Sequence, residues 1–302
     1  MSAAPDTAVI RAAVGRRLQG RGVPIRERAF KLLLWAGIAV AFLFLVILLV
    51  YVVQHGWDRL DSRLWENQPS RRRVAASGAQ SAIMGTIWVI SLTALFCVPT
   101  GVMAAIYLEE YARPDVWINR VIEVNIQNLA AVPSIVYGIL GLAFIARGPL
   151  GLGFTVLTAA LTLSLLVLPI VIISTREAIR AVPNSIRAGS LALGATKWQT
   201  VRRQVLPAAI PGIATGSILA LSRAIGEAAP LLMIGAAGFI AFNPDSVNSR
   251  YTVLPIQIYK WVREPQPEFT TLAWAAVIIL LLILLLMNSI AIVLRNRYQK
   301  RW

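Results

Sequence analysis

Two charged residues, Arg223 and Glu227, lie within an apolar stretch of the 302-residue chain. They are four positions apart, so on a continuous helix they would share one face. Charged side chains at membrane depth usually face a bundle interior or water, and a guanidinium offers a fork of donors that matches an oxyanion. Two interpretations follow. The pair could be a cationic station on an anion pathway, with Glu227 neutralising Arg223 between transport events, or a structural ion pair between helices.

Three further residues could contribute to such a pathway. Ser134 and Tyr137 follow Pro133, which has no N–H and therefore leaves the carbonyl of Leu129 without its helical donor. Both side chains could line a pathway or serve close helix packing. Arg176 ends another apolar stretch. It could be a second station for the anion or an ordinary basic residue of a cytoplasmic loop.

Catalytic and metal chemistry would need residues that this chain scarcely contains. There is one histidine and one cysteine, and the apolar stretches hold no carboxylate cluster. The cysteine, Cys97, lies in an apolar run and can form no internal disulfide. The net charge of +15 would suit nucleic acid if it formed a patch, but the basic residues lie between apolar runs, as in membrane-protein loops. We therefore expect no catalytic site, no metal site and no nucleic-acid partner.

Composition and apolar runs indicate a membrane protein. Hydrophobic residues make up 57% of the chain and charged residues 14%, which is roughly half the charged share of a soluble protein. Six apolar stretches are long enough to cross about 30 Å of hydrocarbon as helices. We predict an all-α integral membrane protein with six transmembrane helices: Leu32–Val53, Ile83–Leu108, Leu129–Ala146, Phe154–Ser174, Ile210–Ile234 and Leu272–Leu294.

The distribution of basic residues predicts the orientation. If the amino terminus is cytoplasmic, the inside segments hold 19 Lys and Arg residues and the outside segments hold nine. Because Lys and Arg accumulate in cytoplasmic loops, we expect both termini in the cytoplasm, although Arg71–Arg73 then fall outside. Splitting Ile210–Phe242 into two crossings would put the basic tail outside and is disfavoured. The predicted domains are a basic cytoplasmic segment (1–31), a transmembrane domain (32–294) and a cytoplasmic tail (295–302).

The loop between the fourth and fifth stretches, about 35 residues long, exceeds a plain connection. We expect a short helix over Ile186–Leu193, capped by Asn184 or Ser185 and ended by Gly194. A second helix is predicted over Thr196–Val205, stopping at the proline that follows. Two short helices with an exposed apolar stripe could dock a partner protein or lie on lipid.

This loop carries a resemblance to a known family. Leu193-Gly194-Ala195, followed by Val205-Leu206-Pro207, resembles the cytoplasmic signature of binding-protein-dependent ABC importer permeases. That signature opens Glu-Ala-Ala, whereas this chain reads Ala188-Gly189-Ser190 and lacks the glutamate. The resemblance implies a MetI-like permease fold in which the loop over 175–209 couples to an ATPase. The residues that would make this contact are Leu191, Leu193, Gly194, Ala195 and Pro207.

Four more stretches are similar to one branch of that family. They are GVMAAIYLEEY at Gly101–Tyr111, AVPSIVYGILG at Ala131–Gly141, SRAIGEAAPLL at Ser222–Leu232 and LAWAA at Leu272–Ala276. In this order they resemble PstA-type permeases, which form half of the translocation pathway of phosphate ABC importers. A sulfate or molybdate permease is an alternative, since either anion would also use an arginine. A secondary transporter would be expected to show inverted repeats, which the sequence lacks.

The resemblance also implies partners and a location. These are a second permease subunit of the PstC type, two ATPase subunits of the PstB type, an extracytoplasmic phosphate-binding protein of the PstS type, and the lipid of the bacterial inner membrane. ATP and Mg would be held by the ATPase. In this chain Gly189, Gly194 and Thr196 have the spacing of a phosphate-binding loop, but Ala195 stands where that loop requires lysine. We therefore expect a multi-pass transport subunit without a cofactor or catalytic site of its own.

Overall fold

The computed structural model describes residues 25–113, 115–236 and 238–298, and the regular structure in these ranges is helical throughout. Contacts divide the chain into two compact units, residues 1–54 and 55–302. Most of the basic segment predicted over residues 1–31 lies outside the described residues, as do the last four residues of the predicted tail. Among the described residues, five helices are long and apolar enough to cross a membrane. They contain α2 (Ile25–Gly56), α4 (Gln80–Ile106), α7 (Val156–Arg180), α10 (Leu206–Gly226) and α13 (Pro267–Tyr298).

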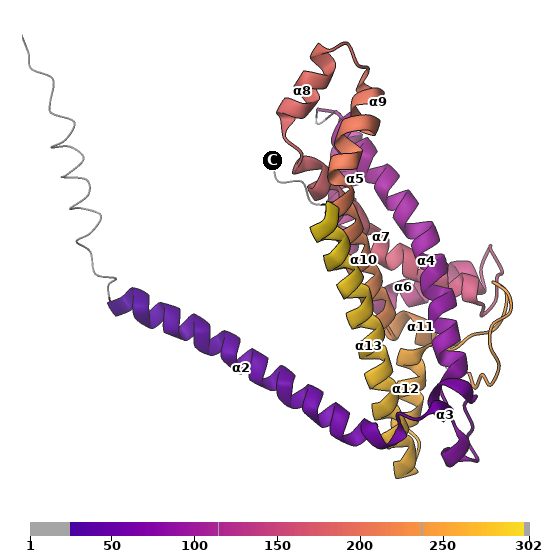
Figure 1. Ribbon diagram of the computed structural model, residues 1–302. Helices are drawn as coiled ribbons and strands as arrows, with labels where there is room; N and C mark the ends of the chain where they lie inside the picture. Colours follow the sequence, from indigo (N-terminus) through magenta and orange to yellow (C-terminus); the bar gives the residue numbers. More distant parts are fainter. Residues whose placement is uncertain (1–24, 114, 237, 299–302) are drawn as a thin grey trace, which may run out of the picture. The chain divides into compact units, whose positions relative to one another are not determined.

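Helix α7 is the centre of the second unit. It packs along α4 and α10, and α10 in turn packs on α13 (Figure 1). Two thirds of the most apolar stretch of α7 is buried inside the chain. Its hydroxyl groups therefore need hydrogen-bond partners within the protein, and some of them find these in the helix itself. Thr162 Oγ1 and Ser164 Oγ donate to the carbonyl oxygens of Thr158 and Ala160, at 2.8 and 2.6 Å. A largely apolar helix whose hydroxyl groups bond to its own backbone suits the middle of a membrane bundle, although the buried hydroxyl of Thr175 has no partner among the described residues.

The third predicted span is not a straight helix. Two helices, α5 (Trp117–Ala131) and α6 (Ser134–Leu140), meet at a bend of 105°. The bend lies at Val132 and Pro133, because proline has no N–H to continue the helix and forces the preceding residue into an extended conformation. The predicted stretch Leu129–Ala146 therefore begins too late and runs across a break. Counted as one crossing, the bent pair brings the candidate spans to six.

The fifth predicted span also ends earlier than Ile234. Helix α10 stops at Gly226, and a separate short helix, α11 (Ala229–Met233), follows. Pro230 explains the break: it cannot donate to the carbonyl of Gly226, four residues earlier, and its ring would clash with that group. Helix α11 packs instead against α6. There a Cβ on Gly138 would lie 2.6 Å from Pro230 Cα. The close contact between α6 and α11 therefore requires a glycine at this position.

Shorter elements fill the two ends of the bundle. Helices α8 and α9 project from one end, and α3 and α12 lie toward the other (Figure 1). The remaining bounds are η1 (Trp57–Arg59), α3 (Ser62–Glu66), η2 (Val74–Ala76), η3 (Tyr107–Tyr111), η4 (Gly141–Ala146), α8 (Asn184–Ala192), α9 (Lys197–Thr200), η5 (Val201–Val205) and α12 (Leu254–Val262). Three of these, η3, η4 and η5, are π-helical turns joined to α-helices.

Candidate functional site

The charged pair predicted within the fifth span lies at the end of α10. Arg223 Nε is 3.5 Å from Glu227 Oε1, so the two side chains do meet. They do not share a helix face, because Glu227 is the extended residue that caps α10. The Arg223 side chain is 52% exposed on this single chain, and that of Glu227 is 19% exposed. Among the described residues Arg223 makes no other polar contact, so most of its donors remain available.

Helix α10 connects this pair to the predicted docking loop. Helix α9, the π-turn η5 and α10 form one uninterrupted helical segment of 30 residues, Lys197–Gly226. At 1.5 Å per residue, Arg223 lies about 40 Å along the segment from Lys197. The guanidinium is therefore at the end of the span that is distant from the loop, and its place in the outer half of the membrane stays a prediction.

Tyr137 has a definite structural partner. Its hydroxyl donates to the carbonyl oxygen of Leu129 at 2.8 Å, the acceptor that Pro133 deprives of a helical donor. The ring is 4% exposed and belongs to the main hydrophobic core. Ser134 is half-buried and is the first residue of α6. The structure thus places Tyr137 across the bend between α5 and α6, and the pathway role of both residues stays a prediction.

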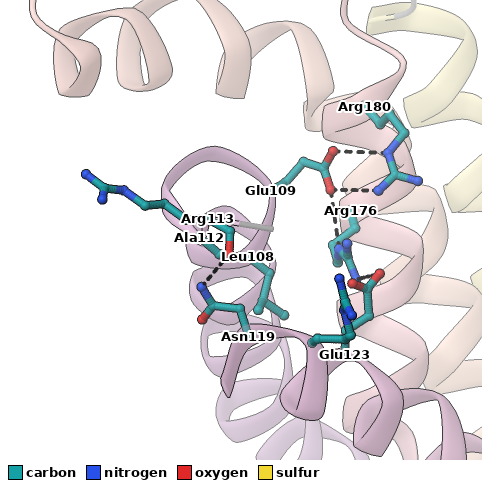
Figure 2. A pocket seen from close by; sticks show the side chains of 9 residues that line it. Leu108, Glu109, Ala112, Arg113, Asn119, Glu123, Arg176 and Arg180 are labelled. Carbon is teal, nitrogen blue, oxygen red and sulfur yellow. Dashed lines mark hydrogen bonds and ion pairs between the residues drawn. The ribbon is translucent and has the colours of Figure 1, made fainter. Parts of the chain in front are cut away.

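Arg176 is part of a network of ion pairs that joins α7, η3 and α5. Its Nε lies 3.3 Å from Glu109 Oε2 on η3, and its Nη1 lies 3.0 Å from Glu123 Oε1 on α5. Arg180, one turn further along α7, donates twice to Glu109 at 3.0 Å. Figure 2 shows Glu109 between the two arginines. Arg176 is only 13% exposed, which is less than expected of a loop residue.

A cavity of about 330 Å³ opens beside this network. It is also lined by Leu108, Ala112, Arg113, Asn119 and Arg120, and Arg113 extends away from it in Figure 2. Arg176 and Arg180 are already paired with carboxylates, so an anion that bound either arginine would compete with those carboxylates. The role of Arg176 as a second anion station therefore stays a prediction, and its described contacts are structural.

The predicted docking loop forms a helical hairpin, α8 and α9. Gly194 ends α8 in the left-handed region at φ +81°, as predicted from its place after the apolar positions. Thr196 caps the second helix in a capping box with Gln199. The predicted caps of the first helix are wrong: Asn184 and Ser185 lie inside α8, and the capping position is Pro183, which makes no side-chain cap bond.

The second helix of the hairpin does not stop at Pro207. Proline lacks the N–H that would bond the carbonyl four residues earlier, and the π-turn η5, Val201–Val205, directly precedes this position. Pro207 then lies in the first turn of α10, where its missing donor is tolerated. The second helix of the hairpin and the fifth span are consequently one continuous helical segment.

The hairpin presents apolar side chains that nothing in the described chain covers. Leu193 is 90% exposed and Leu191 is 50% exposed, while Ala195 and Gly189 line a shallow groove of about 390 Å³ between α8 and the second helix. Ser190 Oγ and Thr200 Oγ1 lie 2.9 Å apart and tie the two helices together. Both leucines are among the predicted docking residues, and their docking role stays a prediction.

Sequence reasoning missed two residues of this region, Glu109 and Glu110. Both occur in the stretch Gly101–Tyr111, which carried the family resemblance, but neither was assigned a role. Their arginine partners are some 70 residues further along the chain, so local patterns could not pair them. The available signal was the presence of two adjacent carboxylates at the end of an apolar run that faces a predicted basic loop.

Residues 97–300 match the family described as binding-protein-dependent transport system inner membrane component. The chain belongs to this family. One fellow member, phosphate transport system permease protein PstA 1 of Mycobacterium tuberculosis, is 33% identical over 260 residues, covering 85% of this chain and 84% of the relative. PstA of Yersinia pestis is 31% identical over 269 residues, covering 89% and 90%. The probable ABC transporter permease protein YqgI of Bacillus subtilis is 33% identical over 227 residues, covering 74% of each chain.

Solved structures of ABC transporters share the fold of this inner-membrane component. A chain of a bacterial alginate ABC transporter, crystallised with an alginate-bound periplasmic protein, gives a TM-score of 0.64 at 17% identity, over 91% of this chain and 96% of the other. A chain of the MetNI methionine transporter gives 0.54 at 19% identity, over 71% and 96%. The predicted all-α, MetI-like membrane fold is confirmed, and the chain is a multi-pass membrane protein.

Proposed function

We propose that this chain is the permease subunit of an ATP-driven importer and forms half of the translocation pathway for inorganic phosphate. The observation that carries the proposal is Arg223, an arginine at the end of an otherwise apolar spanning helix whose side chain is half exposed on the isolated chain. A guanidinium keeps its charge at any physiological pH and presents donors in a fork that suits a tetrahedral oxyanion. The choice of phosphate is supported by the relatives named as phosphate permeases.

Arg223 can alternate between two partners, the carboxylate of Glu227 and the transported phosphate. Without substrate, Glu227 neutralises the guanidinium and lowers the cost of holding a charge in the membrane. At 3.5 Å, the contact between Nε and Oε1 is an ion pair longer than a charge-assisted hydrogen bond. An arriving phosphate can therefore bond to the donors that Glu227 leaves open, and the carboxylate yields as the anion binds.

The rest of the importer is proposed from the family resemblance and the relatives. A PstC-like permease subunit supplies the other half of the pathway, and a PstS-like extracytoplasmic protein delivers phosphate. Two PstB-like subunits bind ATP and Mg and dock on the hairpin through its exposed leucines. This chain then contributes the pathway and the coupling contact and leaves hydrolysis to its partners.

Uptake of competing oxyanions by the reconstituted complex tests the substrate. The four kinds of subunit are co-reconstituted in proteoliposomes that contain ATP, and uptake of labelled phosphate is followed with sulfate or molybdate in excess. We expect phosphate uptake that needs ATP and the binding protein and that neither competitor suppresses. Uptake of sulfate or molybdate in preference to phosphate would replace the proposed substrate, and uptake that persists without ATP would remove the proposed class of importer.

A further inference from the structure

Three consecutive residues of the π-turn η3 contact three different helices. Glu109 pairs with Arg176 and Arg180 of α7. Glu110 pairs with Arg187 of α8. The ring of Tyr111 lies under the Lys197 ammonium at the start of α9, 5.0 Å from the ring centroid. Consecutive side chains on a helix point about 100° apart, so these three neighbouring residues can reach three different helices.

The pair of Glu110 and Arg187 is the best enclosed of these contacts. The side chains are 8% and 19% exposed, and Glu110 Oε1 accepts from Arg187 Nη2 at 2.8 Å and from Nε at 3.1 Å. The same guanidinium donates to the carbonyl oxygens of Val182 and Ile179, at 2.6 and 2.9 Å. Arg187 therefore fastens α8 to the second span through Glu110 and to the end of the fourth span through these two carbonyls.

Apolar packing cannot fix α8 in the same way. No residue of α8 is buried, and its apolar contact with the core comes from Ile186, which is only partly buried. Non-directional apolar contact would let a short helix of this kind slide or rotate. Directional bonds from a planar guanidinium to three acceptors define one orientation.

We propose that Glu110 and Arg187 are positioning residues for coupling: they hold the docking hairpin in a fixed orientation on the second and fourth spans, so that movement of a bound ATPase is passed to the pathway. The contact of Tyr111 with Lys197 does the same for the second helix of the hairpin. This inference rests on the proposed function, since it needs an ATPase that docks on the hairpin. Without the anchor, α8 follows the ATPase while the second and fourth spans stay in place, and only the fifth span, which continues from the second helix of the hairpin, still follows it.

The number of phosphate ions imported per ATP hydrolysed tests the anchor. In the reconstituted complex, Glu110→Gln and Arg187→Gln are each expected to leave the ATPase bound and hydrolysing but to lower this ratio on the order of tenfold, within the range of known coupling between sites. The double variant should be no worse than the poorer single variant, because the two residues act as one unit. Glu177→Gln is the matched control: this carboxylate pairs with Arg180 within α7 on an exposed face and joins no two elements.

If the variants at the enclosed residues Glu110 and Arg187 do not assemble, the exposed residue Lys197 provides a second test. Lys197→Gln removes the cation above the Tyr111 ring and should lower the ratio by about two- to fivefold. An unchanged ratio in every assembled anchor variant, or an equal loss in Glu177→Gln, would overturn the anchor. Failure of the wild-type complex to import phosphate would instead overturn the proposed function, so the two failures are distinguishable.

Discussion

Arg223 has one described ion-pair partner, Glu227, and several unused donors. Substitutions at these two positions therefore distinguish an anion-handling arginine from one that only forms a structural ion pair. If the guanidinium handles the anion, Arg223→Gln should abolish phosphate uptake while the complex still assembles and docks its binding protein. Glu227→Gln should be milder, because the positive group remains. Uptake by proteoliposomes and the thermal stability of the purified complex, measured for both single variants, check this expectation.

The double variant Arg223→Gln/Glu227→Gln provides the decisive comparison. If the pair were only structural, each single change would leave one charge uncompensated in the membrane and cost up to a few kcal/mol. The double change would then restore stability and transport together. Recovery of phosphate uptake in this charge-free variant would refute an anion-handling role for Arg223.

Tyr137 is the clearest case of a predicted pathway residue with a structural partner. Tyr137→Phe keeps the buried ring and removes only the hydroxyl that caps the Leu129 carbonyl. We expect the loss of about 1 kcal/mol of stability, the usual worth of one hydrogen bond, with phosphate uptake retained. Uptake per assembled complex and the midpoint of thermal unfolding are the measurements. Loss of uptake at unchanged stability would return Tyr137 to the pathway.

At the scale of elements, the contact between α6 and α11 depends on a missing side chain. A Cβ on Gly138 would lie 2.6 Å from Pro230 Cα and 2.9 Å from its carbonyl oxygen, and backbone atoms cannot rotate away. Gly138→Ala should therefore destabilise the permease by about 1–3 kcal/mol through overpacking. Gly37→Ala is the control, because a Cβ there meets nothing within 4 Å. Equal thermal stability of the two variants would contradict the close packing of these helices.

At Leu193 in the docking hairpin, the effect of a substitution on folding can be separated from its effect on ATPase docking. Leu193 is 90% exposed, so Leu193→Asp should change the stability of this chain by no more than about 0.5 kcal/mol. In an apolar contact with the ATPase, the same carboxylate would be buried without a partner, at a cost of several kcal/mol. We expect ATPase binding and uptake to be lost, while Leu193→Met preserves both. Normal uptake by Leu193→Asp at normal abundance would rule out the docking role.

The sequence was informative where one apolar helix crosses alone and less so where prolines interrupt a run. Hydropathy located α2, α4, α7 and α13 because length and apolarity suffice for such helices. The sequence indicates that Pro133 leaves the Leu129 carbonyl without its helical donor. It does not predict the 105° bend between α5 and α6, because that depends on how α6 packs against α11. Pro207 was expected to end a helix, yet a π-turn precedes it and the helix continues. These outcomes depend on tertiary contacts that no local pattern contains.

At the scale of the whole molecule, the orientation in the membrane is the principal untested prediction. The excess of Lys and Arg in the segments assigned to the inside predicts that both termini and the hairpin lie in the cytoplasm. In a background that carries Cys97→Ala, which removes the only native thiol, cysteines introduced at Arg16, Ser185 and Lys300 should react with an impermeant reagent only after the membrane is opened. A cysteine at Arg250 should react in intact cells. Labelling of any of the first three in intact cells would contradict the orientation.

The π-turn η5 also constrains how the chain length can vary. An α-helix turns by about 100° for each residue, and a π-turn accommodates one residue more than an α-turn. Removing one residue from Val201–Val205 would therefore convert the turn to ordinary helix and leave the second helix of the hairpin in nearly the same orientation relative to Arg223. Adding or removing one residue within α10, where no such turn absorbs the change, would rotate that helix by about 100° relative to Arg223. Insertions and deletions among functional homologues should therefore spare α10, and a one-residue deletion within Lys197–Gly226 should be tolerated only at the π-turn.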